Sequence, residues 1–453
     1  MNRPILNALR ARAAAGTPIR TGVIGAGAFG ANVVTTMAEA PGMTAAAVAD
    51  LNVEAAIAAY LSAGHVRDEV LVAARAGDAA DGVRAGRPVV VPDGALLAEL
   101  PLDAVVDSTG VPETGADLAA RSLRAGQHVV MVNVEADVVV GAALRRLADA
   151  SGVVYTLADG DQPSLICGLA DFAATLGLEV LAGGKGTTEY PEGHPRRVAI
   201  EADPPDGKRT WVMDIEGSKT QIEMAAAANV MGWGVDTRGL HGPSIRLEQI
   251  ATAFGPRAGG GLFERTPVVD YVNCLTPDGN TPIENPVRNG VFVVVTSQNP
   301  TIRKALRSKG VPMSADGSRG LLWRPFHLVG VETPYSVAQA VLFGTGTATP
   351  LPDPTVELIA VAKHDLPAGT RLDGMGDNRT RGVAEMAAPA AAQRLLPVGL
   401  ANGVRLRRAV PAGAVLTYDD LEAEGDTPCW RLRRDAGLLP PALSPAGVRA
   451  RSL

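Results

Sequence analysis

One short stretch near the start of this 453-residue chain restricts the available folds more than any other. The segment "RTGVIGAGAFGANVV", residues 20–34, places an apolar run before three glycines, Gly25, Gly27 and Gly30, and a helical pattern after them. Gly25 permits a tight turn, Gly27 allows backbone amides to approach a phosphate, and Gly30 allows the helix to pack on the strand. The segment therefore predicts the first strand–turn–helix unit of a doubly wound parallel sheet that binds a dinucleotide.

An acidic residue at a suitable distance indicates which dinucleotide is bound. A second apolar run, "MTAAAVAD", ends at Asp50, about 20 residues beyond the last glycine. A carboxylate at this spacing accepts hydrogen bonds from the ribose hydroxyls and repels a 2′-phosphate. The sequence therefore predicts NAD(P) as the cofactor, with NAD favoured over NADP. The pyrophosphate would lie at the N-terminus of the following helix, which begins around Ala28 and Phe29.

Four later apolar runs continue the alternation of strands and helices to about residue 160. Polar residues follow two of these runs, and the carboxyl ends of parallel strands face the ligand crevice in such sheets. The residues that we expect at the cofactor on this ground are Ser108, Thr109, Gly110, Asn133 and Glu135. The alternative is that each is an ordinary turn residue. We assign residues 1–160 to a Rossmann NAD(P)-binding domain.

Residues 161–349 change to longer helices, strands and glycine-rich loops, which predicts an α+β substrate domain. Lys185 lies between two glycines in "AGGKGT", and either an ordinary surface turn or a close approach to a ligand explains it. In "DIEGSKTQIEM", Ser218 and Gln221 match a capping box. The helix is therefore expected to begin at Ser218, with Lys219 in its first turn.

The position of Lys219 suggests chemistry. A cation in the first turn faces the positive end of the helix dipole, so it loses its proton more easily unless an acid compensates. Asp214 precedes it closely, and Glu223 lies one turn later on the same face. A surface Lys–Glu pair is the plain alternative. We interpret Lys185, Lys219, Asp214 and Glu223 as the catalytic residues.

Three further residues are assigned to the substrate: Asp161, Thr187 and Arg324. Arg324 is a candidate for binding an anion, although an ion pair explains it as well. His327 lies in apolar company in "RPFHLVG" and is expected to be a core histidine. A helix near 334–345 is expected to return to the Rossmann domain.

Composition excludes several classes of function. The net charge is −6 and no block of lysine or arginine stands out, which argues against nucleic acid or a membrane as partner. The three cysteines, Cys167, Cys274 and Cys429, are far apart and indicate neither a disulfide framework nor a zinc cluster. We therefore expect a cytoplasmic protein with a small-molecule substrate and no predicted metal ligands. We also expect a homo-oligomer.

The C-terminal region begins after the proline-rich linker "TATPLPDPT". Two similar phrases follow, "AVAKHDLPAGTRL" and "RLRRAVPAGAVLTYDDL", each with a "PAG" turn between two short strand patterns. They predict a small β-rich domain over residues 355–425, followed by a C-terminal tail over 426–453.

These two phrases resemble a SAF domain, the small module shared by antifreeze-like, sialic-acid-synthase-like and flagellar chaperone proteins. The first part of the chain resembles the homoserine dehydrogenase-like oxidoreductases. The order of "GDQPSL", "AGGKGT", "IEMAAAAN" and "RPFHL…ETP" resembles a bacterial family that fuses the two. The resemblance implies an NAD(P)-dependent oxidoreductase with Gly25, Gly27 and Gly30 at the cofactor and with Lys185 and Lys219 at the substrate.

The resemblance leaves the substrate open. Homoserine dehydrogenases have an "NK" phrase, whereas Asn133 is followed by Val134 here, which argues against homoserine. One branch of the fused family resembles 1-deoxy-D-xylulose 5-phosphate reductoisomerase and would use NADPH and a divalent metal, a cofactor that Asp50 fits poorly. The main interpretation is a dehydrogenase or reductase acting on a small polar, phosphorylated or sugar-derived substrate. The alternatives are such a reductoisomerase and a non-catalytic redox sensor whose SAF domain contacts a partner.

Overall fold

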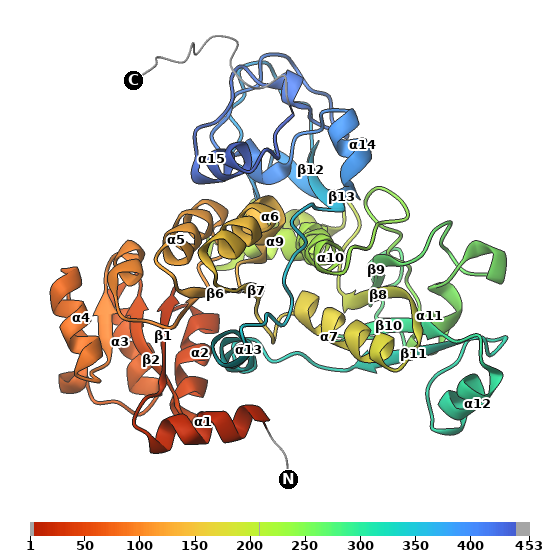
Figure 1. Cartoon of the computed structure of the whole chain (residues 1–453). Helices are drawn as coiled ribbons and strands as arrows, with labels where there is room; N and C mark the ends of the chain where they lie inside the picture. The colour runs from red at the N-terminus through yellow and green to blue at the C-terminus, as the bar shows by residue number, and fades with distance from the viewer. Residues whose placement is uncertain (1–3, 208, 441–453) are drawn as a thin grey trace.

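The computed structural model describes residues 4–207 and 209–440, which form three parts that meet near the centre of the molecule (Figure 1). The first part contains a seven-stranded sheet in which every neighbouring pair is parallel. From one edge the strands are β3 (Leu71–Val72), β4 (Val89–Val91), β2 (Met43–Ala49), β1 (Ile19–Ile24), β5 (Ala104–Asp107), β6 (His128–Met131) and β7 (Tyr155–Leu157). The strand order changes direction between β1 and β5, and in doubly wound sheets the ligand crevice opens at this point. The predicted fold class is confirmed.

Helices join and cover these strands, whose valine-rich runs are buried as expected for a parallel sheet. They are α1 (Pro4–Ala14), α2 (Ala28–Glu39), α3 (Val53–Ser62), α4 (Ala76–Arg84), α5 (Pro112–Arg124) and α6 (Val134–Ser151). A later helix, α13 (Thr333–Phe343), returns to this part, where Val337 and Ala338 join its hydrophobic core. The sequence predicts a helix near 334–345 that returns to the Rossmann domain, and α13 lies in this segment.

The second part is built on a four-stranded mixed sheet in the order β11 (Arg319–Arg324), β10 (Val291–Thr296), β8 (Glu179–Thr187) and β9 (Val268–Asn273). β8 and β9 run parallel, and β10 runs antiparallel to both of its neighbours. The helices of this part are α7 (Gln162–Thr175), α8 (Pro195–Ala202), α9 (Arg209–Glu216), α10 (Ser218–Met231), α11 (Leu247–Ala253) and α12 (Pro300–Ser308). Its mixture of sheet and helices agrees with the predicted α+β character.

The third part contains the antiparallel pair β12 (Val356–Ala362) and β13 (Thr380–Met386), and the helix α14 (Ala387–Ala392). The two "PAG" phrases lie against each other, because Leu366 and Val410 exchange backbone hydrogen bonds of 2.8 Å in both directions. A further helix, α15 (Pro428–Asp435), falls in the predicted tail and packs on α5 and α6 with Trp430 fully buried. The rest of that tail, 441–453, lies outside the described residues.

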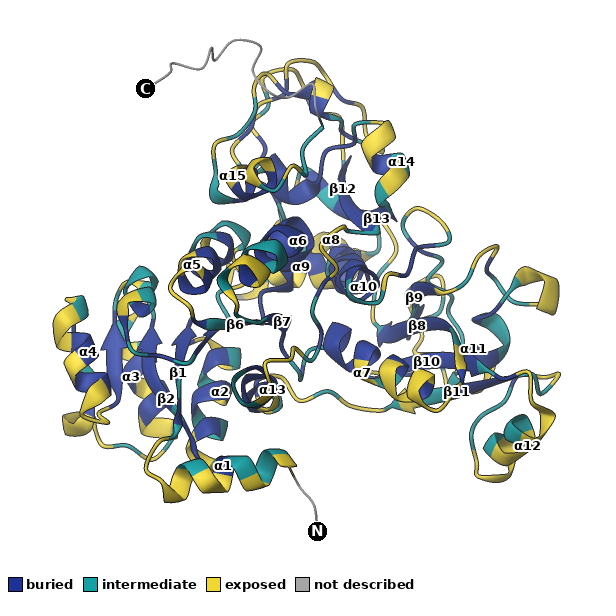
Figure 2. Ribbon diagram, in the orientation of Figure 1, coloured by how far each residue is buried: buried dark blue, intermediate teal, exposed yellow. Residues whose placement is uncertain are grey.

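The third part is joined to the second mainly through α10, which is buried at the centre of the molecule (Figure 2). The capping box predicted at its start is wrong, because Gly217 is the N-cap residue. Ser218 Oγ instead accepts a hydrogen bond from the Gly382 amide of β13 at 3.1 Å. Gln221 Oε1 accepts one from the Ala384 amide at 3.0 Å. These two side chains therefore anchor the C-terminal part rather than cap their own helix.

Cys167, Cys274 and Cys429 are buried free thiols. Burial raises the pKa of Cys167 and Cys274, so both thiols stay protonated. Within residues 4–207 and 209–440, no helix combines the length and the apolar character required to cross a membrane.

Candidate active site

The glycine turn after β1 has the geometry of a phosphate-binding turn. Gly25 has a φ of +91°, and a Cβ at Gly30 would lie 1.9 Å from Gly25 O, so both positions require glycine. A Cβ at Gly27 would meet no protein atom within 4 Å. Gly27 is also the N-cap of α2 and gives the helix no side-chain cap. The amides of Ala28 and Phe29 in the first turn of α2 are therefore in position for a phosphate.

Asp50 is fixed beside this turn. Its Oδ2 accepts a hydrogen bond from the Ala26 amide at 2.6 Å, and its Oδ1 accepts one from the Asn52 amide at 2.7 Å. Each carboxylate oxygen retains a second lone pair for a hydroxyl group. Asp50 thus both supports the glycine turn and stays able to bind a ribose.

A cavity of about 630 Å³ opens at the switch point of the sheet and contains this turn. Of the residues predicted at the cofactor, it is lined by Gly25, Gly27, Asp50, Ser108 and Thr109. Its other acidic lining residues are Asp93, Glu113 and Asp117, and no lysine or arginine lines it within the described chain. The turn, the uncapped helix and the carboxylate together fit a dinucleotide.

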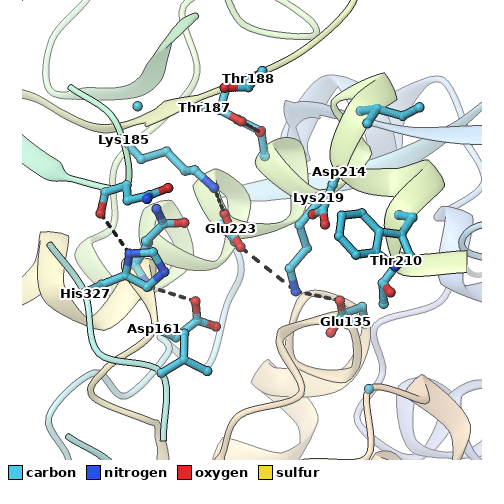
Figure 3. A pocket seen from close by; sticks show the side chains of 18 of the residues that line it. Glu135, Asp161, Lys185, Thr187, Thr188, Thr210, Asp214, Lys219, Glu223 and His327 are labelled. Carbon is cyan, nitrogen blue, oxygen red and sulfur yellow. Dashed lines mark hydrogen bonds and ion pairs between the residues drawn. The ribbon is translucent and has the colours of Figure 1, made fainter. Parts of the chain in front are cut away.

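A second cavity, of about 660 Å³, lies where the first two parts meet and shares Ser108 with the first; we call it the active-site cavity. Figure 3 shows its interior. The predicted residues that line it are Phe29, Ser108, Gly110, Asn133, Glu135, Asp161, Lys185, Thr187, Asp214, Lys219 and Glu223. The structure therefore brings the four proposed catalytic residues into one space.

Two lysines and two glutamates form a continuous chain of ion pairs in this cavity. Lys185 pairs with Glu223 Oε2, and Lys219 Nζ lies 4.0 Å from Glu223 Oε1. Lys219 Nζ also donates to Glu135 Oε1 at 2.6 Å (Figure 3). Glu135 and Glu223 are only 3 % and 4 % exposed, and buried charges of this kind need partners. Glu135 was predicted at the cofactor, and in the structure its carboxylate pairs with Lys219.

The surrounding acids determine the protonation of Lys219. Desolvation lowers its pKa, but the charges of Glu135, Glu223 and Asp161 outweigh this effect and raise the pKa above its usual value. The compensating acids required by the position of Lys219 are therefore present, and Glu135 is the strongest of them. Lys219 remains an ammonium group at neutral pH.

Two aspartates in the cavity titrate close to neutrality. Desolvation by the surrounding cavity raises the pKa of Asp214 to about 6, against the opposing effect of the Lys219 charge, although the residue is exposed to solvent. Burial and the charge of Glu223 likewise raise the pKa of Asp161 to about 6. Asp161 is the N-cap of α7, where its carboxylate accepts a hydrogen bond from the Gln162 amide at 2.8 Å. Asp214 is thus the carboxyl group better placed to exchange a proton with a ligand.

The surroundings of Lys185 differ from the sequence-based interpretation. Lys185 lies inside β8 and is buried, so it is not in a surface turn. Its flanking glycines admit neighbouring backbone rather than a ligand. A Cβ at Gly184 would lie 2.1 Å from Asp270 O, and one at Gly186 would lie 1.3 Å from Val287 O.

Two residues near β11 also differ from expectation. Arg324 does not line the active-site cavity, and its Nη1 pairs with Glu332 Oε2 at 2.7 Å. The ion pair, not the substrate role, accounts for this residue in the structure. His327 was expected to be a core histidine, which is wrong, because it lines the active-site cavity and its Nδ1 lies 2.8 Å from Asn289 O.

Sequence reasoning missed two arginines of the cavity, Arg196 and Arg288. Both are exposed, and in the described part of the chain neither guanidinium has an ion-pair partner. Arg196 lies 5.4 Å from the centre of the Tyr190 ring. Arg196 lies beside Arg197 in the short helix α8, and Arg288 lies in a loop, so no motif or periodicity marked either residue as part of a site.

Within the described residues, no group of three or more His, Cys, Asp or Glu side chains is arranged to hold a metal ion. Lys185 and Lys219 separate the carboxylates of the cavity and occupy their oxygens. The donor set therefore does not fit the divalent metal that a reductoisomerase would use.

The family described as oxidoreductase DRL, catalytic domain, matches residues 160–333, the part of the chain that carries Lys185, Lys219, Asp214 and Glu223. Together with the dinucleotide turn, this match makes the protein an NAD(P)-dependent oxidoreductase. No curated protein matches the chain.

Several solved structures align with much of the chain at low identity and low structural similarity. A myo-inositol dehydrogenase from Corynebacterium glutamicum is 12% identical, with a TM-score of 0.38, over 73% of this chain and 90% of its own. A 3-ketoreductase from Actinomadura kijaniata is 17% identical, with a TM-score of 0.37, over 73% and 91%. The 1-deoxy-D-xylulose 5-phosphate reductoisomerase from Zymomonas mobilis is 14% identical, with a TM-score of 0.33, over 46% and 56%. At this level of similarity the structures say nothing about the substrate.

Proposed function

We propose that the protein is an NAD-dependent dehydrogenase or reductase that acts on a carbonyl or hydroxyl group of a small, polar, anionic substrate. The observation that carries this proposal is the position of Lys219. Its ammonium group is held between Glu135 and Glu223 in the active-site cavity, which adjoins the cavity of the glycine turn. A redox sensor has no need of such a buried group of lysines and acids.

In this proposal, different residues of the cavity stabilise charge and transfer the proton. A bound nicotinamide would supply or accept the hydride. Lys219, which stays protonated, donates a hydrogen bond to the reacting oxygen and stabilises the negative charge that develops there. Asp214, with its pKa raised to about 6, accepts the hydroxyl proton in oxidation and returns it in reduction. Lys185 neutralises Glu223 and so preserves the field around Lys219.

The charges around the dinucleotide site support the proposed choice of NAD over NADP. The cavity of the glycine turn is lined by Asp50, Asp93, Glu113 and Asp117 and, within the described residues, by no cation. A 2′-phosphate would meet repulsion and no arginine or lysine there. These charges support NAD.

The two arginines support an anionic substrate. Arg196 and Arg288 line the active-site cavity without ion-pair partners in the described chain, and guanidinium groups bind carboxylates and phosphates in bidentate fashion. Either anion fits. A phosphate would also suit the reductoisomerase alternative, but the carboxylates and lysines of the cavity do not fit its metal. The SAF resemblance of the C-terminal part stays a prediction.

A reduction assay tests the proposal. Purified protein is incubated with NAD and one compound at a time from a set of sugar acids, polyols and sugar phosphates. The formation of NADH is followed by its absorbance. We expect turnover with anionic members of the set, and loss of turnover in the Arg288→Ala variant at low substrate concentration. Turnover of uncharged polyols alone would contradict the anionic assignment, and no turnover by wild type of any compound would contradict the proposed activity on this substrate class.

A further inference from the structure

A third cavity, of about 500 Å³, lies between the loop after β5 and the C-terminal part; we call it the distal cavity. Gly110, Glu135 and Thr210 line both the distal cavity and the active-site cavity. The two spaces therefore meet at Glu135, the partner of Lys219. The residues that the C-terminal part contributes to the distal cavity are Asp373, Met375, Gly399 and Asn402.

The C-terminal wall of the distal cavity is held in place by its own hydrogen bonds. The Asp373 amide donates to Asp377 Oδ2 at 3.0 Å, and Arg379 Nη1 donates to Asp373 Oδ2 at 2.8 Å. The Gly403 amide donates to Leu372 O at 2.9 Å and so joins the loop of Asn402 to the loop of Asp373. A wall fixed in this way loses little conformational entropy when it binds a ligand.

The chemistry of the distal cavity differs from that of the active-site cavity. Its polar lining consists of carboxylate, amide and hydroxyl groups, namely Thr109, Glu113, Glu135, Thr210, Asp373 and Asn402. Within the described residues, no lysine, arginine or histidine lines it. Glu113 also has a buried carboxylate oxygen, Oε1, that no group in the described chain hydrogen-bonds. Such groups accept hydrogen bonds from hydroxyls, and the described lining residues offer no cation to a phosphate or a carboxylate.

The apolar lining of the distal cavity also suits a ligand that carries hydroxyl groups. Val111, Met213 and Met375 contribute hydrocarbon or thioether surface next to these polar groups. The carbon chain of a sugar or sugar acid presents C–H groups and hydroxyls side by side, and it requires both kinds of contact. The anion of such a molecule would remain with Arg196 and Arg288 in the active-site cavity.

We propose that the C-terminal part completes the substrate site, and that the distal cavity binds the uncharged, polyhydroxylated end of a sugar-acid-like substrate. The inference rests on the proposed function for the position of the reacting end near Lys219. It gives the C-terminal part a role in selecting substrates by the length of their hydroxylated chain.

Isothermal titration calorimetry with D-glycerate and D-gluconate as probes tests this inference, at saturating NADH so that the hydroxy acids bind without being oxidised. The two acids share an α-hydroxy carboxylate and differ in the length of the hydroxylated chain. We expect wild type to bind D-gluconate at least roughly tenfold more tightly than D-glycerate, which is the scale of one or two added contacts. Asn402→Trp, which fills the distal cavity, should remove this difference. Asn378→Trp, at an exposed position that does not line the cavity, is the matched control and should retain it.

Two results in wild type would overturn the inference, namely equal affinities for the two acids or no binding of D-gluconate. A third would be an Asn402→Trp variant that loses its affinity for NAD and keeps its affinity for D-gluconate. Met375→Trp provides a second filling variant if Asn402→Trp does not fold. A protein that binds D-gluconate with the expected selectivity but reduces no NAD would retain the inference and contradict the proposed function. The two failures are thus distinguishable.

Discussion

Lys219 and Glu135 come from different parts of the molecule, and their Nζ and Oε1 atoms lie 2.6 Å apart. Each residue is in the first turn of its helix, α10 for Lys219 and α6 for Glu135. The positive end of the helix dipole favours the carboxylate and disfavours the ammonium group. Glu135 therefore supplies the charge that keeps Lys219 protonated, and it joins the dinucleotide part to the substrate part at the point where the reaction is proposed to occur.

Replacing Lys219 by Met tests this relationship. We expect the catalytic constant to fall by roughly 10²–10⁴, the scale associated with proton-handling groups and oxyanion stabilisers. The affinity for NAD should hardly change, because Lys219 does not line the cavity of the glycine turn. The melting temperature should fall, since Glu135 is left buried without its partner.

A double variant separates stability from catalysis. In Lys219→Met/Glu135→Gln the uncompensated carboxylate is gone, so we expect the melting temperature to recover towards that of wild type while turnover stays low. Steady-state kinetics beside a thermal melt measures both quantities. Full turnover in Lys219→Met would exclude the proposed role of this lysine.

The sequence predicts well those features that depend on neighbouring residues. The glycine turn, the helix after it and Asp50 lie within a single strand–helix–strand unit, and the structure places them together. The first-turn position of Lys219 is likewise local and is confirmed. Patterns of this kind are set by backbone sterics and hydrophobic periodicity, which short segments determine by themselves.

Features that depend on tertiary contacts could not be predicted in this way. Glu135 and Lys219 are 84 positions apart, so their pairing exists only once the two parts have docked. Ser218 and Gln221 match a capping box, yet in the structure both side chains accept hydrogen bonds from backbone amides of β13. Gly186 is a glycine because the backbone of Val287 approaches it, a contact that no motif encodes.

Two glycines of the turn provide a matched pair for testing dinucleotide binding. At Gly27 a side chain would meet no protein atom, so Gly27→Val should fold with a nearly unchanged melting temperature and lose NADH binding. At Gly30 a Cβ would lie 1.9 Å from Gly25 O, so Gly30→Ala should lower the melting temperature by distorting the turn. Fluorescence titration of NADH and a thermal melt measure these effects. Unimpaired NADH binding by a folded Gly27→Val protein would argue against the phosphate site.

Asp50 provides the test of cofactor choice. We expect wild type to bind NADH at least roughly tenfold more tightly than NADPH, because a 2′-phosphate would face the carboxylates of this cavity. Asp50→Asn removes the charge but keeps one side-chain oxygen for the backbone amides, so it should narrow the difference. Asp50→Ala loses the acceptors of both the Ala26 and Asn52 amides and should weaken both cofactors. A wild-type preference for NADPH, measured by calorimetry, would favour the reductoisomerase alternative instead.

Asp214 should determine how the reaction depends on pH. Desolvation by the surrounding cavity raises the pKa of its carboxyl to about 6, so the group is protonated below this pH and ionised above it. If Asp214 accepts the substrate proton, the rate of oxidation should rise as the pH increases through about 6 and then level off. The rate of reduction should fall over the same range, because the protonated acid is the donor.

The Asp214→Asn variant should lose this dependence together with roughly 10²–10⁴ in the catalytic constant. Asp161→Asn is the control, since the pKa of Asp161 is also raised to about 6 and its side chain caps α7. A raised pKa means that ionisation of the carboxyl destabilises the folded state as the pH rises. The stability of Asp214→Asn relative to wild type should therefore be greater at pH 8 than at pH 5. If the pH dependence disappears in Asp161→Asn and persists in Asp214→Asn, Asp161 exchanges the substrate proton and the role proposed for Asp214 is wrong.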